Sequence, residues 1–120
     1  HVLILFNNAM ASVALFKTRK EQRHLLGMVR TGGIGEVTEI ADKPTSTDLT
    51  NAWGAVAWKS GFWKYIDASH PNFGCGLQLA VDSKVSIKGV NTTGSYHDCG
   101  TFESYASLIR DLTEVNHATV

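Results

Sequence analysis

Two short polar clusters carry the residues whose types and spacing could do chemistry. The first is Asp42-Lys43-Pro44, which follows the alternating segment 36–40. A carboxylate beside an ammonium at the end of a strand can bind a polyhydroxylated phosphate, because the carboxylate accepts hydrogen bonds from hydroxyls and the lysine holds the phosphate as a point charge. Charged residues before a proline are also typical of a solvated turn, so the triplet alone leaves both interpretations open.

The second cluster is the segment 96–101, which reads YHDCGT. We expect a strand near residues 95–98 that ends at Asp98, a sharp turn at Gly100 and a helix whose N-cap is Thr101. This arrangement would present one carboxylate at the sheet edge where α/β proteins bind ligands. One carboxylate together with substrate phosphates is a usual way to hold Mg²⁺. The alternative is that Asp98 is only a turn residue beside a helix.

Other patterns argue against other kinds of site. The glycine-rich segment 31–35 lacks the lysine and serine of a P-loop and precedes a strand, so it predicts a hairpin turn. His97 and Cys99 lack the paired partners that a zinc site needs, and two cysteines in the whole chain are no disulfide framework. The three tryptophans are five residues apart, which favours core packing over a base-stacking surface.

Composition indicates one globular unit over residues 1–120. The chain is 43% hydrophobic and 18% charged, and its 11 basic residues balance its 11 acidic ones. Nucleic-acid binders usually show a basic excess, so we expect no nucleic-acid partner. The longest apolar run, 2–6, is too short for a membrane span and no leader pattern is present, so we expect a cytoplasmic protein without a membrane partner.

The hydrophobic pattern predicts an α/β fold. Strands are expected at 2–6, 12–16, 25–30, 36–40, 52–58, 84–88 and 95–98, and helices at 60–68, at 76–82 and after residue 101, with a frayed tail after residue 114. The runs 2–6 and 12–16 are continuously apolar, which is typical of strands buried on both faces. Only residues 7–11 separate them, so they form an antiparallel hairpin or lack a joining helix, and we favour the second interpretation.

Taken in order, these motifs resemble the sugar-1-phosphate nucleotidyltransferase family, glucose-1-phosphate thymidylyltransferases in particular. The motifs are GMV at Gly27, the glycine hairpin, VTEI before DKP, NAWGA, FWKYI, LQLA and finally YHDCGT before a helix. The similarity runs from about Val13 to Arg110 and corresponds to the C-terminal half of the family's domain.

The resemblance implies a fold, an activity and roles for five residues. The fold would be part of a mixed, mostly parallel Rossmann-like sheet with flanking helices and a β-hairpin. The activity would be transfer of a nucleotidyl group from a nucleoside triphosphate to a sugar 1-phosphate, with Mg²⁺ as cofactor and pyrophosphate as the second product. Lys43 would bind the sugar phosphate, Asp42 would accept from sugar hydroxyls, and Asp98 would hold Mg²⁺. Gly27 and Gly54 would let the backbone approach the sugar.

The sequence departs from the family pattern at its start. The glycine-rich loop that grips the triphosphate is absent, and Asn7 and Asn8 stand where the first metal aspartate is expected. We therefore expect the 120 residues to be part of a larger protein and not to turn over alone. A non-catalytic module that binds a sugar phosphate or nucleotide sugar is the alternative function. The sequence specifies neither base nor sugar, and leaves open whether the protein is a homo-oligomer.

Overall fold

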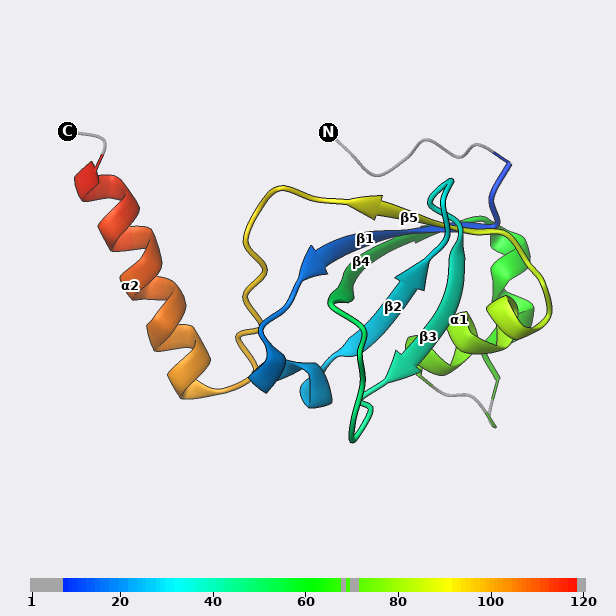
Figure 1. The fold of residues 1–120 in the computed structure, drawn as a ribbon, viewed down its shortest axis with the longest axis horizontal. Helices are drawn as coiled ribbons and strands as arrows, with labels where there is room; N and C mark the ends of the chain where they lie inside the picture. The colour runs from blue at the N-terminus through cyan, green and yellow to red at the C-terminus, as the bar shows by residue number, and fades with distance from the viewer. Residues whose placement is uncertain (1–7, 68, 70–71, 119–120) are drawn as a thin grey trace.

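The structure is a computed structural model that describes residues 8–67, 69 and 72–118 (Figure 1). The elements in chain order are β1 (Ala11–Lys17), the 3-10 helix η1 (Lys20–Leu25), β2 (Gly27–Thr31), β3 (Val37–Asp42), β4 (Asn51–Trp58), the 3-10 helix η2 (Ser60–Tyr65), α1 (Phe73–Asp82), β5 (Ile87–Asn91) and α2 (Phe102–Ala118). Within the described ranges, no helix has both the length and the apolar character needed to cross a bilayer.

The described strands form one sheet in the order β3-β2-β4-β1-β5. Residues 11–15 of β1 are all buried, which confirms the prediction of a strand covered on both faces. The α/β class is confirmed as well. Pairing is parallel only between β1 and β5 among these strands and antiparallel elsewhere, whereas the family resemblance implied mostly parallel pairing. An apolar run shows that a strand is buried but not which way its neighbours run.

The predicted β-hairpin is confirmed as β2 and β3. Its turn closes with a bond from the Gly32 N–H to the Glu36 carbonyl oxygen at 2.8 Å, and Gly35 has a φ of 81°, which favours glycine. The hairpin tip reaches the opposite edge of the sheet, where the Gly89 N–H of β5 donates to the Gly35 carbonyl oxygen at 2.8 Å. The sheet is therefore strongly curled, because its first and last strands in spatial order meet at this tip.

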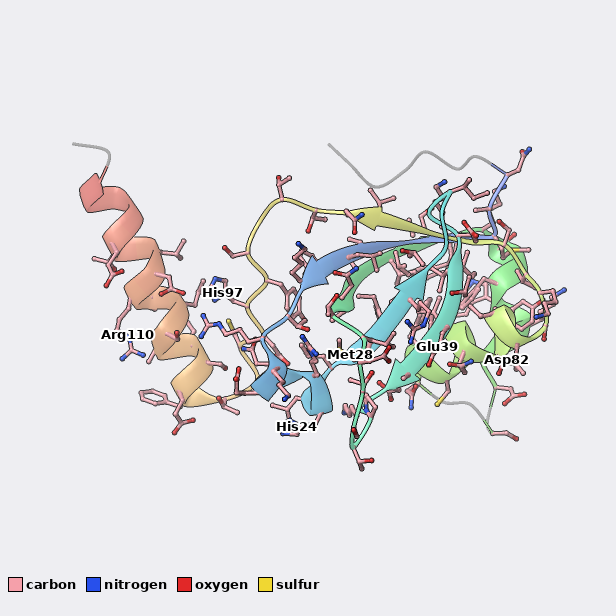
Figure 2. All side chains as sticks on the ribbon, viewed as in Figure 1. His24, Met28, Glu39, Asp82, His97 and Arg110 are labelled. Carbon is pink, nitrogen blue, oxygen red and sulfur yellow. The ribbon has the colours of Figure 1, made fainter. Side chains whose placement is uncertain are left out.

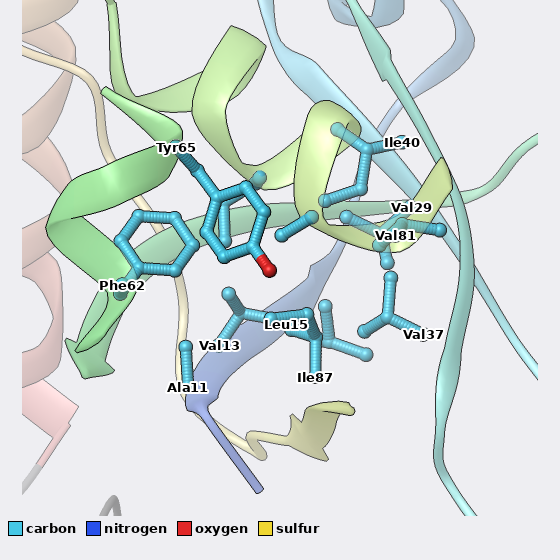
Figure 3. Packing of buried hydrophobic residues seen from close by; sticks show 12 residues of the cluster. Ala11, Val13, Leu15, Val29, Val37, Ile40, Phe62, Tyr65, Val81 and Ile87 are labelled. Carbon is cyan, nitrogen blue, oxygen red and sulfur yellow. The ribbon is translucent and has the colours of Figure 1, made fainter. Parts of the chain in front are cut away.

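Helix α1 covers the concave side of this sheet and completes the main core (Figures 1 and 3). Val13 and Leu15 of β1 alternate toward this core, and Leu77 of α1 packs into it. The helix begins after Asn72, whose side chain accepts a hydrogen bond from the Cys75 N–H at 2.7 Å. It therefore starts earlier than the predicted 76–82, since the asparagine cap sets its first turn.

Two other boundaries differ from the prediction. The helix expected at 60–68 is the 3-10 helix η2, and the residue in its N-cap position is Lys59, without a side-chain cap. Strand β5 begins at Ile87 instead of residue 84, because Lys84 adopts a left-handed conformation with φ 60° where α1 ends. The predicted strand at 2–6 lies outside the described residues.

The C-terminal part differs most from the prediction. Residues 95–98 form no strand and follow an irregular path from β5 to α2. Thr101 caps α2 as predicted, since its Oγ1 accepts from the Ser104 N–H at 3.1 Å, but the helix continues to Ala118 without fraying at residue 114. Figure 1 shows α2 standing away from the sheet. Its apolar residues Phe102, Tyr105, Ile109 and Leu112 are accordingly exposed.

Candidate functional site

A surface hollow lies between η1 and the start of α2, and Asp98 is part of its wall. It has a volume of about 660 Å³. The lining residues are Lys17, Thr18, Arg19, Gln22, Leu25 and Leu26 on one side, and Ser95, Tyr96, His97, Asp98, Gly100, Thr101, Ser104, Ser107, Asp111 and Glu114 on the other. We refer to this hollow as the Asp98 cleft.

The turn at Gly100 presents Asp98 to this cleft. One oxygen of the carboxylate, Oδ1, accepts from the Gly100 N–H at 3.1 Å, which is an Asx-type turn. Across the described part of the chain the carboxylate has no other hydrogen-bond or ion-pair partner. The prediction that Asp98 ends a strand is wrong, and a side-chain-capped turn followed by a capped helix positions the carboxylate instead.

Charges of both signs line the Asp98 cleft. Lys17 and Arg19 lie on its β1 side, while Asp111 and Glu114 of α2 lie opposite. His97 Nδ1 is 3.7 Å from Asp111 Oδ2, an ion pair when the imidazole is protonated, and Figure 2 shows His97 between the sheet and α2. The cleft can therefore bind an anionic group at its β1 side and a cation near Asp98.

Lys43 adjoins this cleft through its backbone. Its N–H donates to the Leu26 carbonyl oxygen at 3.0 Å, and Leu26 belongs to the cleft wall. The residue also has a φ of 47°, in the left-handed region that costs an L-residue about 1–2 kcal/mol. Strain of this kind, held next to a cleft, is an observation that favours a functional role for Lys43.

Asp42 and Gly27 face a different part of the molecule. They are directly paired across β2 and β3, so both point to the face that α1 covers. Asp42 lines a smaller groove of about 240 Å³ together with Ile40, Gly74, Cys75, Gln78, Leu79 and Asp82. A Cβ at Gly27 would lie 2.2 Å from Trp53 Nε1, so the space over this glycine is filled by the indole. The buried Trp53 N–H has no partner in the described structure.

Gly54 faces the side of the sheet opposite to α1. A Cβ there would lie 2.6 Å from Phe16 Cε2 and 2.7 Å from Tyr96 Cε2. Asp98 and Leu26 line one cleft, and Lys43 is bonded to Leu26 but does not itself line that cleft. The space over Gly54 meets the same cleft through Tyr96. Asp42 and Gly27 lie on the other side of the sheet.

Sequence reasoning did not single out Tyr96 or Phe16, which lie against Gly54. Their rings pack with centroids 4.9 Å apart. Burial first, and then repulsion from the nearby Asp98 carboxylate, raise the pKa of Tyr96. The available signal was the glycine inside the predicted strand 52–58, because a strand glycine often marks a close approach by another group.

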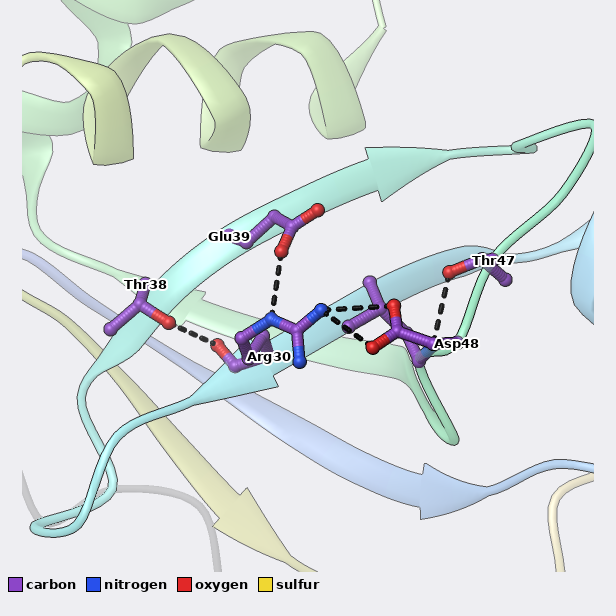
Figure 4. A network of polar contacts seen from close by, with 6 residues as sticks. Arg30, Thr38, Glu39, Thr47 and Asp48 are labelled. Atoms are coloured by element: carbon purple, nitrogen blue, oxygen red, sulfur yellow. Dashed lines mark hydrogen bonds and ion pairs between the residues drawn. The ribbon is translucent and has the colours of Figure 1, made fainter.

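A polar network fixes the loop that follows Lys43. Arg30 on β2 donates from Nε to Glu39 of β3 at 2.8 Å and from one terminal nitrogen to both carboxylate oxygens of Asp48 at 3.0 and 3.1 Å (Figure 4). These bonds raise the pKa of Arg30, and those from Arg30 lower the pKa of Asp48. The loop 43–50 is thus tied to the hairpin at a point after Lys43.

The donor set fits a cation held mainly by substrate. Within the described ranges, no three histidine, cysteine, aspartate or glutamate side chains gather in a way that could hold a metal ion. Mg²⁺ keeps several waters and commonly takes only one or two protein carboxylates plus substrate phosphates. Asp98 supplies one such carboxylate, so it can serve as the protein ligand only when phosphates complete the coordination.

The fold is similar to part of the fold of solved UDP-glucose pyrophosphorylases and of a putative glucose-1-phosphate thymidylyltransferase. A UDP-glucose pyrophosphorylase solved with UDP-glucose is similar to this chain with a TM-score of 0.73 and 16% identity, over 87% of this chain and 44% of that one. A UTP-bound enzyme of this kind from Acinetobacter baumannii has a TM-score of 0.69, 10% identity and coverages of 88% and 40%.

A third similar structure is a putative glucose-1-phosphate thymidylyltransferase from Bacillus anthracis in complex with a sucrose, with a TM-score of 0.68, 17% identity and coverages of 82% and 42%. The chain therefore spans less than half the length of each of these three structures. No protein-family model and no curated protein matches the sequence.

Proposed function

We propose that this chain is the sugar-phosphate half of a nucleotidyltransferase that joins a nucleoside triphosphate to a sugar 1-phosphate and releases pyrophosphate. The observation that carries this proposal is a likeness in fold to such enzymes, combined with a carboxylate in a cleft whose wall residue Leu26 accepts a backbone hydrogen bond from the strained Lys43. The similar structures include uridylyl- and thymidylyl-transferring enzymes, so UTP and dTTP are the first nucleotides to test.

The reaction is displacement at phosphorus. An oxygen of the sugar phosphate attacks the α-phosphorus, and the bond to the pyrophosphate oxygen breaks, so no covalent enzyme intermediate is needed. Mg²⁺ supplies neutralisation of the phosphate charge when it is bound. Lys43 would bind the sugar phosphate and stabilise charge in the transition state, while Asp98 would hold the cation. Asp42 and Gly27 would orient the sugar from the α1 face of the sheet, or Gly54 from the opposite face, since one sugar cannot contact both faces.

The placement of Asp42 and Gly27 means that a sugar can contact them only if a neighbouring side chain moves. Both face the α1 side of the sheet, where the indole of Trp53 covers Gly27. If these two residues contact the sugar, the indole has to move when the sugar binds. Replacing Trp53 with a smaller residue should then change the KM for the sugar phosphate more than kcat.

The test is pyrophosphate release by the intact gene product with glucose 1-phosphate and either UTP or dTTP. Lys43→Ala and Asp98→Asn should each lower kcat/KM by about 10²–10³-fold, because each removes a charge that acts on the phosphates. Lys20→Ala in η1 and Glu103→Gln at the start of α2 are matched controls, since neither residue lines the Asp98 cleft.

Two results would contradict the proposal. Unchanged kcat/KM in both Lys43→Ala and Asp98→Asn would place the chemistry elsewhere. Calorimetric binding of glucose 1-phosphate without Mg²⁺-dependent release of pyrophosphate would instead favour the non-catalytic binding module.

A further inference from the structure

Gly54 creates a gap in β4 that the rings of Phe16 and Tyr96 fill. The glycine has no positive φ, so its backbone conformation does not require glycine. The requirement is steric: a Cβ would come within 2.6 Å of Phe16 Cε2 and 2.7 Å of Tyr96 Cε2. Real Cβ atoms do not approach other heavy atoms this closely, so any larger residue at position 54 must displace one or both rings.

The Tyr96 ring is the point at which an otherwise loosely held segment meets the sheet. The segment that leaves β5 is first anchored at Thr92, whose N–H and hydroxyl both donate to the Leu15 carbonyl oxygen at 2.9 Å. It is next fixed by the turn at Gly100 and the cap at Thr101. Between these anchors, no hydrogen bond joins residues 93–97 to the sheet in the described part of the chain.

The ring stacks against Phe16, with centroids 4.9 Å apart and an interplanar angle of 34°. Aromatic pairs at this separation contribute about 0.5–1.5 kcal/mol beyond the area they bury. Because Asp98 follows Tyr96 by two residues, a fixed ring limits where that carboxylate can lie. The packing of Tyr96 on Phe16 can therefore act on the Asp98 cleft through the backbone between residues 96 and 98, and Tyr96 is itself part of the cleft wall.

We propose that Tyr96 is a positioning residue, docked by its ring on Phe16 in the gap left by Gly54, which holds Asp98 at the cleft. This inference rests on the proposed function, because it assigns Tyr96 a role through the carboxylate that would hold Mg²⁺. Gly54 then serves the metal side of the site through Tyr96, and a sugar could approach its backbone only if the rings of Phe16 and Tyr96 moved.

The experiment uses the intact gene product with Gly54→Ala, Tyr96→Ala, Tyr96→Phe and Gly94→Ala. Gly94 precedes Tyr96 in the same segment and has open space around it, so its alanine variant is a matched control. The first readout is hydrogen–deuterium exchange of residues 92–101. The second is the Mg²⁺ concentration that gives half-maximal pyrophosphate release.

Gly54→Ala and Tyr96→Ala should speed exchange in 92–101 while β1 and β4 stay protected. They should also raise the half-saturating Mg²⁺ concentration about tenfold, the usual scale for residues that orient a metal ligand. Tyr96→Phe keeps the ring and should behave like the wild type, as should Gly94→Ala. Tyr96→Ala lies outside the strands, so it keeps the test valid if Gly54→Ala fails to fold.

Wild-type exchange and wild-type Mg²⁺ dependence in Tyr96→Ala would overturn the inference. Faster exchange without a change in Mg²⁺ dependence would also overturn it, because the dock would then be purely structural. The proposed function is tested separately by Asp98→Asn. If this variant keeps the wild-type Mg²⁺ dependence, the proposed function fails whatever the Tyr96 variants show.

Discussion

A comparison of Lys43 with Lys84 separates the catalytic role proposed for Lys43 from the effect of its backbone strain on stability. Both are lysines in the left-handed region, with φ of 47° and 60°, and only Lys43 adjoins the Asp98 cleft. Lys43→Gly and Lys84→Gly should each raise the free energy of unfolding by up to about 1 kcal/mol, the relief of a left-handed L-residue less the added chain entropy of glycine. Chemical denaturation measures this change.

The same two variants should differ in catalysis. Lys43→Gly should lose activity in the pyrophosphate-release assay and Lys84→Gly should not. Equal activity in both would show that the strain at Lys43 serves only the turn before Pro44.

The ion pair of Arg30 with Asp48 predicts a pH dependence at the residue scale. Because Arg30 lowers the pKa of Asp48 in the folded state, the pair contributes stability above the unfolded-state pKa of Asp48, and this contribution is lost as the pH falls through the folded-state pKa. The melting temperature of Asp48→Asn should therefore lie below that of the wild type at neutral pH. The difference should shrink in acid and at high salt, since both side chains are well exposed. A constant difference across pH would contradict this explanation.

At the element scale, we expect the side chains of Asn72 and Ser60 to contribute unequally to stability. Asn72 caps α1 with its side chain, whereas Ser60, a good N-cap type, makes no capping bond in η2. Asn72→Ala should therefore cost about 1 kcal/mol of unfolding free energy, while Ser60→Ala should change it by less than about 0.5 kcal/mol. Urea denaturation of the two variants checks this. Equal losses would mean that Ser60 caps its helix in solution.

At the scale of the whole molecule, the apolar face of α2 poses a question about the intact protein. Phe62 is fully buried, whereas Phe102 is 81% exposed in this chain. Phe62→Ala should cost about 3–5 kcal/mol of stability, and Phe102→Ala should cost less than about 0.5 kcal/mol if α2 stays uncovered. Thermal and urea unfolding of the intact gene product measure both. If Phe102→Ala lowered the free energy of unfolding as much as Phe62→Ala, another part of the intact protein would have to cover α2.

The sequence by itself determined the local elements whose signals are local. The β2–β3 hairpin follows from a glycine turn between two alternating runs, the burial of β1 from a continuous apolar run, and the cap of α2 from Thr101. Only the tertiary structure decided the direction of strand pairing, the meeting of the hairpin tip with β5, and the opposite faces of Gly27 and Gly54. Alternation predicts that a strand has two faces, but which face meets a helix depends on contacts between residues far apart in the chain. For the same reason, the role proposed for Gly54 depends on the Tyr96 ring, which comes from a distant part of the chain.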